Sequence, residues 1–378
     1  MYLSFWIAFL IIDTFSSFAD GSLDGPRVTL RDKDVPVQRY SLPMSNGWTE
    51  LLLGSGNRTL YVGGHGKIWA INFEKVNRLE EVNFFERVKT EPKSAATGLN
   101  MKCMENLPGT GIAPFNMTEQ APSLSIEDKQ DRVYTFLVQK ETDPHPEASP
   151  LTSWVSQICT ADIGGPKAIL QGKWTSRLNA RLACGERDQG QLFDQLLDVV
   201  VLKDENWRDS RCVSDSTKLP NDVLKHMMDY PDMENWVWPI DGSGPLMVSH
   251  SHYRRIQVDS VMGSRRSHKK FNVLLLSLKS GGLHKVVELD GKSFIIAEMQ
   301  LFSSGTRIQN MLLQPSTKRL YVSSGREVVE VDLRACLRYG PRCEDCVLAQ
   351  DPYCSWNGTH CSAVSASREH GDVFRKQG

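Results

Sequence analysis

The sequence lacks any excess of charge of one sign, because its 44 lysine and arginine residues are balanced by 45 aspartate and glutamate residues. Such a chain has no long-range field to attract nucleic acid or an anionic membrane surface. Beyond the N-terminus no segment approaches about 18 consecutive apolar residues, the length expected of a membrane-spanning helix. We therefore expect no nucleic-acid partner and a chain that is soluble once made.

Motifs of catalytic sites are also missing. The sequence contains no Gly-x-Ser-x-Gly elbow, no His-Glu-x-x-His pair, no phosphate-binding loop and no aspartate box. His250 and His252 have the spacing of two ligands on one face of a strand, but no third metal ligand can be named, and a pair of surface histidines is the alternative. We expect no enzyme, no cofactor and no metal, and keep a secreted hydrolase built on a propeller as the enzymatic alternative.

The N-terminus indicates export. Residues Tyr2–Ile12 are apolar, and Ser17 and Ala19 have the spacing that signal peptidase prefers. A buried segment of a cytosolic protein is the alternative. Three Asn-x-Thr sequons, at Asn57, Asn116 and Asn357, support the secretory route. The sequence thus predicts a signal peptide over residues 1–19, three glycosylated asparagines and a secreted, extracellular chain.

Nine cysteines are unevenly distributed. Cys103, Cys159, Cys184 and Cys212 are scattered, whereas Cys336, Cys343, Cys346, Cys354 and Cys361 fall within 26 residues. Taken alone, the Cys-x-x-Cys pair in the cluster suits redox or zinc chemistry. No second such pair follows, and a segment this small needs cross-links in place of a core. We therefore favour a disulfide knot, with at least one unpaired thiol or an intermolecular bond because the total is odd.

From Gly47 to about Arg334 the pattern is one of short strands and glycine turns. Clear hairpins are expected over residues 60–73, 271–287 and 319–332, and another strand over 132–138. A hairpin that recurs at wide spacing is typical of a β-propeller, with a β-sandwich as the alternative. One helix is expected over 220–230, with Val223, Met227 and Tyr230 on one face.

Several separated motifs resemble the semaphorin family. The cluster contains Asp351-Pro-Tyr-Cys354-Ser-Trp356, the hallmark of a plexin-semaphorin-integrin (PSI) module. The body is similar to a sema domain over the segments DRVYTFLVQKE, VSQICTADIGGPKAILQGKWTSRLNARLAC, QLFDQLLDVVVL and LHKVVE. The resemblance implies an all-β fold, a sema β-propeller followed by a small disulfide-rich PSI module. It divides the chain into a signal peptide (1–19), an N-terminal segment (20–46), the sema domain (47–334), the PSI module (335–363) and a polar tail (364–378).

The chain is shorter than the family pattern. Stretches are skipped after Cys103 and after Asp209, so the propeller is expected to lack some blade segments. By resemblance, three disulfides join Cys159 to Cys212, Cys336 to Cys354, and Cys346 to Cys361. Cys103, Cys184 and Cys343 would then be unpaired, since their partners lie in the skipped stretches.

The resemblance also implies a partner. Family members bind plexin receptors as homodimers, and the likeness points to a plexin of the C type, with roles in axon guidance, cell migration and immune regulation. An inactive or decoy isoform is the alternative. A member of the family carries Arg-Gly-Asp after the cysteine aligned with Cys159, where this chain has Thr160-Ala161-Asp162. Without the arginine, integrin binding by this route is doubtful.

Two further features stay open. The basic stretch Arg265-Arg-Ser-His-Lys-Lys270 could contact heparan sulfate or be a solvated hairpin loop. The lipid-anchor signal by which full-length relatives sit at the cell surface is not found in this sequence, which again leads us to expect a secreted chain.

Overall fold

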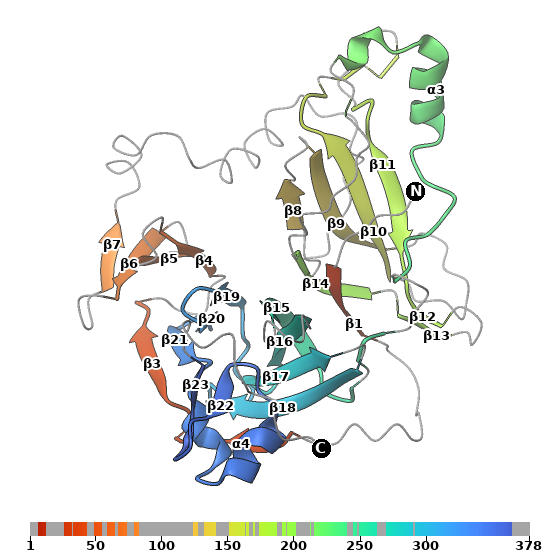
Figure 1. Ribbon diagram of the computed structural model, residues 1–378. Helices are drawn as coiled ribbons and strands as arrows, with labels where there is room; N and C mark the ends of the chain where they lie inside the picture. The colour runs from red at the N-terminus through yellow and green to blue at the C-terminus, as the bar shows by residue number, and fades with distance from the viewer. Residues whose placement is uncertain are drawn as a thin grey trace. The chain divides into compact units, whose positions relative to one another are not determined.

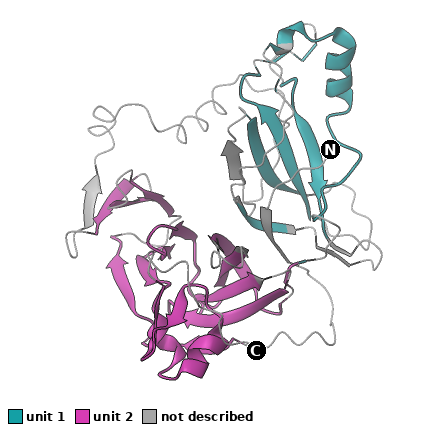
Figure 2. Cartoon of the chain, viewed as in Figure 1, with its two compact units in different colours: residues 1–17, 91–245 teal, residues 18–90, 246–378 magenta. Residues whose placement is uncertain are grey.

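The computed structural model describes residues 7–12, 26–31, 33–43, 49–54, 59–64, 67–73, 79–82, 124–127 and 132–140 and, with gaps, 151–262 and 270–364. The chain divides into two compact units. Unit 1 comprises residues 1–17 and 91–245, and unit 2 comprises residues 18–90 and 246–378 (Figure 2). Each unit is built almost entirely from antiparallel β-sheet.

Unit 2 contains three sheets of four or five strands (Figure 1). The first is β4-β5-β6-β7, with bounds Glu50–Leu53, Thr59–Gly64, Lys67–Asn72 and Leu79–Val82. The second is β15-β16-β17-β18-β2, with bounds Tyr253–Met262, Lys270–Leu278, Gly282–Leu289, Lys292–Gln300 and Val28–Leu30. The third is β19-β20-β21-β3, with bounds Asn310–Gln314, Arg319–Ser323, Glu327–Asp332 and Val37–Ser41. Two of these sheets are thus completed by strands from near the N-terminus.

Unit 1 contains one four-stranded sheet, β11-β10-β9-β8. Its strands span Leu178–Leu182, Leu151–Cys159, Arg132–Lys140 and Leu124–Glu127. Two small pairs accompany it, namely β12 (Cys184–Glu186) with β13 (Gln191–Phe193), and β1 (Ile7–Ile12) with β14 (Gln195–Val201). Among the described residues of this unit, the helical elements are η2 (Ser216–Lys218) and α3 (Asn221–Asp229). A four-stranded meander is the unit from which propeller blades are made.

The strands arise from the alternation that the sequence displays. In β5, Leu60 and Val62 are fully buried while their neighbours are partly exposed, and Ile71 of β6 is buried opposite Leu60. These side chains form one cluster with Leu42, Tyr321 and Val328, so the first and third sheets of unit 2 share a core. β16 and β17 are instead buried on both faces and read as nearly continuous apolar runs.

The predicted hairpins are present as β5–β6, β16–β17 and β20–β21, and the predicted strand over 132–138 is β9. The helix also forms, but the face we predicted for it is wrong. Leu224 is the buried residue, while Val223 and Tyr230 are exposed. Leu224 lies beside the predicted stripe, roughly 100° around the helix from Val223. A nine-residue helix with one buried side chain has too weak a pattern to fix its face.

The predicted signal peptide contains β1, which pairs antiparallel with β14 of unit 1. Cleavage after residue 19 would remove this strand, so removal of residues 1–19 and a structural role for β1 are alternatives for the mature chain. In the part of the chain that the structure describes, no helix is long and apolar enough to cross a membrane.

Candidate functional site: the disulfide module and its junction with the sheets

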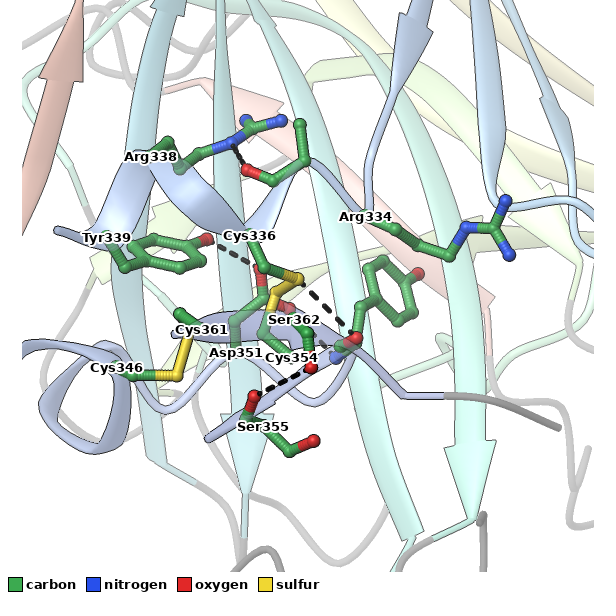
Figure 3. Close-up of a disulfide and its surroundings, with 12 residues drawn as sticks. Arg334, Cys336, Arg338, Tyr339, Cys346, Asp351, Cys354, Ser355, Cys361 and Ser362 are labelled. Carbon is green, nitrogen blue, oxygen red and sulfur yellow. Dashed lines mark hydrogen bonds between the residues drawn. A yellow bond between two sulfur atoms is a disulfide. The ribbon is translucent and has the colours of Figure 1, made fainter. Parts of the chain in front are cut away.

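The C-terminal module packs into the core of unit 2. It consists of η4 (Cys336–Tyr339), α4 (Cys343–Ala349), and the hairpin of β22 (Cys354–Trp356) and β23 (Cys361–Ala363). Disulfides join Cys336 to Cys354 and Cys346 to Cys361 (Figure 3). All four cysteines are buried and belong to the same apolar cluster as β16–β21. The module is therefore a continuation of the sheet core and not an appendage on a linker.

Asp351 of the Asp-Pro-Tyr-Cys motif is buried and meets a buried lysine. Lys285 of β17 is completely inaccessible, and its Nζ donates to Asp351 Oδ2 at 2.5 Å and to the Leu333 carbonyl at 3.0 Å. Tyr339 OH donates to the same Oδ2 at 2.5 Å (Figure 3). Asp351 Oδ1 accepts the Tyr353 N–H at 3.0 Å. A buried charge needs an opposite charge and further hydrogen bonds, and this pair has both.

Tyr353 extends the junction to a second strand. Its hydroxyl donates to Asp259 Oδ2 of β15 at 2.6 Å, and Lys318 Nζ donates to the same oxygen at 2.7 Å. Lys285 Nζ lies 4.2 Å from the Tyr353 ring centroid, within cation–π range. The motif thus connects the module to β15 and β17 of the second sheet and, through Lys318, to the turn before β20 of the third sheet. The charged pair lies at the centre of this polar network.

Burial controls protonation in this network. Desolvation lowers the pKa of Lys285 to about 8, although Asp351 opposes the shift. Desolvation and the negative charge of Asp351 hold the pKa of Tyr339 well above its usual value. Desolvation, followed by Asp259, raises the pKa of Tyr353. The two tyrosines therefore remain hydrogen-bond donors at neutral pH.

The junction has the chemistry of a fixed connection. Its acid and base are paired with each other inside the core, so neither is presented to a substrate. Among the described residues no group of three histidine, cysteine, aspartate or glutamate side chains could hold a metal. What the arrangement provides is a rigid attachment of the disulfide module to the sheets.

In unit 1 the structure joins Cys159, at the end of β10, to Cys212, with Cα atoms 5.9 Å apart. Directly after Cys159, Asp162 is almost fully buried, with 9% of its surface exposed. Its Oδ1 accepts from Gly164 N and Thr175 Oγ1, and its Oδ2 accepts from the Ser176 N–H and hydroxyl at 2.7 and 2.6 Å. The Asp162 carboxylate closes a loop through these bonds, and it would have to break them to bind the metal ion of an integrin. Thr160 and Ala161 carry no guanidinium group that could take the place of the arginine of an Arg-Gly-Asp motif.

The remaining predicted residues are dispersed. Cys343 is exposed at the start of α4 and forms no disulfide within the described residues, whereas Cys184 lies in β12 opposite Phe193. Asn357 is exposed in the turn between β22 and β23, where its side-chain oxygen accepts from the Thr359 and His360 N–H groups. His250 and His252 are both exposed. Cys103, Asn57, Asn116 and residues 265–269 lie outside the described residues.

Sequence reasoning missed Lys285 and Asp259. Both lie within strands whose polar residues are expected to face solvent, and a lysine in an alternating strand is normally exposed. The acidic residue of the Asp-Pro-Tyr-Cys motif was the available signal, because a carboxylate inside a disulfide knot requires a buried partner.

With this geometry in view, comparisons with known proteins identify the two parts. Residues 183–315 match the family model described as Sema domain, and residues 335–376 match the model described as Plexin repeat. Human Semaphorin-7A is 29% identical over 63% of this chain and 43% of its own length. The chain thus spans less than half the length of this curated relative.

Solved structures agree in fold. Drosophila Semaphorin 1a, extracellular domains 1–2, gives a TM-score of 0.62 at 14% identity, covering 90% of this chain and 96% of that one. A chain of the structure titled "Drosophila Plexin A in complex with Semaphorin 1b" gives 0.56 at 17% identity, covering 87% and 82%. At these identities the likeness concerns the fold alone. The sheets of this protein are those of a sema domain, its disulfide module is a plexin repeat, and the chain belongs to the semaphorin family.

Proposed function

We propose that this chain is an extracellular recognition protein that binds a plexin receptor of the C type. Through that receptor it acts in axon guidance, cell migration and immune regulation. The observation that carries the proposal is the attachment of a plexin repeat to sema sheets through a common core and a buried ion pair. Such a scaffold holds its loops rigidly, and rigid loops suit recognition of a large protein surface.

The comparisons support the partner at the level of class. One structure of the same fold is titled as a complex of a semaphorin with a plexin, and Semaphorin-7A is among the curated relatives. The plexin-C type is the finer part of the proposal and rests on the resemblance of the sequence motifs. Homodimers would raise avidity for a receptor displayed on a membrane. Catalysis is not part of the proposal, since the acid–base groups of the junction are buried against each other.

A second function, that of a decoy or an inactive isoform, is suggested by the sequence, in which stretches of the family pattern are skipped after Cys103 and after Asp209. A chain that occupies the receptor without bringing two copies together would block signalling.

A cell assay separates the two functions. The secreted chain is added to cells that display plexin-C, and to matched cells that display plexin-A, and bound protein and receptor signalling are both recorded. Binding with signalling on plexin-C cells supports the ligand function. Binding that is silent and that competes with an active semaphorin supports the decoy. Absence of binding to plexin-C cells would contradict both the ligand and the decoy, and would leave the inactive isoform.

A further inference from the structure

Six basic residues gather at one end of the second sheet of unit 2. They are His250, His252, Arg254, Arg255, Lys279 and Arg307, and we call them the basic cluster. They come from the segments 249–255, 279–282 and 301–309, which contain no aspartate or glutamate. Basic residues on segments that carry no acidic residue create a local positive potential in a protein whose net charge is close to zero.

Hydrogen bonds hold the three segments together. The Lys279 N–H donates to the His252 carbonyl at 2.9 Å, and the Gly305 N–H donates to the Ser280 carbonyl at 3.1 Å. Arg255 Nε donates to the Gln309 carbonyl at 2.8 Å. The positive charges are therefore fixed relative to one another by the backbone of two hairpins and a loop.

A β-bulge places two arginines next to each other. Tyr253 pairs with Leu278 and Ile256 with Leu276, so Arg254 and Arg255 together oppose Ser277. The bulge is held by a bond from the Arg255 N–H to Ser277 Oγ at 2.9 Å. Regular strands send successive side chains to opposite faces, and a bulge interrupts this alternation and redirects a side chain.

The arginines repel one another. Burial, and then the positive charges of Arg307 and Arg255, lower the pKa of Arg254. Within the described residues neither Arg254 nor Arg307 forms an ion pair with a carboxylate. Two carboxylates near these segments have other partners, because Glu298 bonds His284 and Glu50 bonds Asn310. A binding anion would relieve this repulsion without displacing an existing partner.

We propose that the basic cluster binds a sulfated polysaccharide chain. Its cations are spread over three neighbouring segments, an arrangement that suits a polymer with repeated sulfate groups better than a single anion. Arginine forks can bind oxyanions through two bonds, and the serines of the same segments offer further donors. The site requires the extracellular location of the proposed function but does not depend on plexin binding.

The test measures binding of the full secreted chain to immobilised heparin at physiological salt. The variant carries Arg254→Gln and Arg307→Gln, leaving Arg255 intact because it holds the loop. The control carries Lys33→Gln and Lys292→Gln, two exposed lysines of unit 2. We expect the variant to bind roughly tenfold more weakly, with a shallower salt dependence, and the control to bind like the native chain.

Three results would overturn the proposal. The first is unchanged heparin binding by the Arg254/Arg307 variant. This includes the case in which a second variant, with Gln substitutions at Arg265, Arg266, Lys269 and Lys270, loses heparin binding. The second is equal binding to chemically desulfated heparin. The third is loss of plexin-C binding by the Arg254/Arg307 variant while heparin binding stays intact, which would assign the cluster to the receptor. If the double variant unfolds, Arg307→Gln alone, in an exposed loop, gives the same readings.

Discussion

Lys285 shows how a single residue determines the attachment of a module. A fully buried ammonium is tolerated because Asp351, a backbone carbonyl and the Tyr353 ring surround it. The contribution of such a pair to stability is small when compared with an apolar pair, but removal of one partner leaves the other charge buried and uncompensated. A displaced module would leave these charges buried without their partners, so the pair favours one position of the module against the sheets.

Replacement of Lys285 by Met should lower the free energy of unfolding by about 3 kcal/mol, because Asp351 stays buried with one charged partner fewer. Lys292→Met is the control, since this lysine at the start of β18 is exposed and forms no ion pair in the described part of the chain, so its loss should cost about 0.5 kcal/mol or less. Chemical denaturation of both variants checks the difference. The double variant Lys285→Met, Asp351→Asn should lose less than the sum of the single changes, and full additivity would show that the two residues do not interact.

The raised pKa values of Tyr339 and Tyr353 predict alkaline unfolding. Each group ionises more readily in the unfolded chain, so its contribution to stability is complete below about pH 10 and is lost as pH rises above that value. Lys285 acts in the opposite direction, because its lowered pKa makes stability rise between about pH 8 and 10.5. Stability should therefore fall only above about pH 10.5. Absorbance of tyrosinate together with circular dichroism tests this, and a steady loss of stability beginning at pH 8 would contradict it.

At the scale of residues, those that belong to a sequence motif could be predicted. The residues that bind to the motif in the folded protein could not. The cysteines and Asp351 stand in a recognisable pattern, whereas Lys285 and Asp259 acquire their role only when two strands are placed beside the module. Asp162 illustrates the same limit, because its carboxylate is occupied by Thr175 and Ser176, which follow more than ten positions later. Partners of this kind depend on tertiary packing, which no local pattern encodes.

At the scale of elements, the turn between β16 and β17 depends on Gly281. Its φ of +88° is unfavourable for other residues, and a Cβ there would lie 3.0 Å from the Thr306 carbonyl oxygen. The backbone of the loop over residues 303–309 therefore leaves no room for a side chain at position 281. This contact also positions Arg307 of the basic cluster.

Gly281→Ala should lower the free energy of unfolding by about 2 kcal/mol, from backbone strain and the close contact together. Gly305→Ala is the control, since Gly305 has a similar φ of +84° but nothing within 4 Å of the added Cβ, so only strain of about 1 kcal/mol is expected. Thermal unfolding of the two variants measures the difference. Equal effects would show that the contact with the loop contributes nothing.

The two disulfides of the module should differ sharply from its remaining thiol. Replacing Cys346 and Cys361 by Ser opens a 15-residue separation and should cost about 3 kcal/mol. Cys343→Ser, at an exposed position without a disulfide in the described part of the chain, should leave the melting temperature unchanged. Calorimetry of both variants tests this. A large loss for Cys343→Ser would mean that this cysteine has a structural partner.

Elements were predictable where alternation is strong. The β5–β6 hairpin follows from apolar alternation around a glycine turn, and the β16–β17 hairpin follows from two apolar runs around Ser280 and Gly281. The helix over 221–229 follows from its position between prolines. The face of that helix was wrong because Leu224 alone is buried. The fifth strand β2 and the closing strand β3 could not be assigned to sheets, since their partners lie about 270 and 290 residues away along the chain.

At the scale of the molecule, N-terminal processing determines whether β1 belongs to the mature protein. We expect the secreted chain to begin at Asp20, because residues 1–19 have the pattern of a signal peptide. N-terminal sequencing of protein purified from culture medium gives the answer. A mature chain that retains Ile7–Ile12 would instead make β1 a permanent partner of β14.

The most direct test of the account is the affinity of the monodisperse secreted chain for the plexin-C ectodomain, measured by surface plasmon resonance with the plexin-A ectodomain as reference. The account predicts saturable binding to plexin-C. It also predicts that Lys285→Met loses this binding, because the sema sheets need the attached module in order to bind the receptor. A folded, monodisperse chain that binds neither ectodomain would contradict the assignment of plexin recognition to this protein.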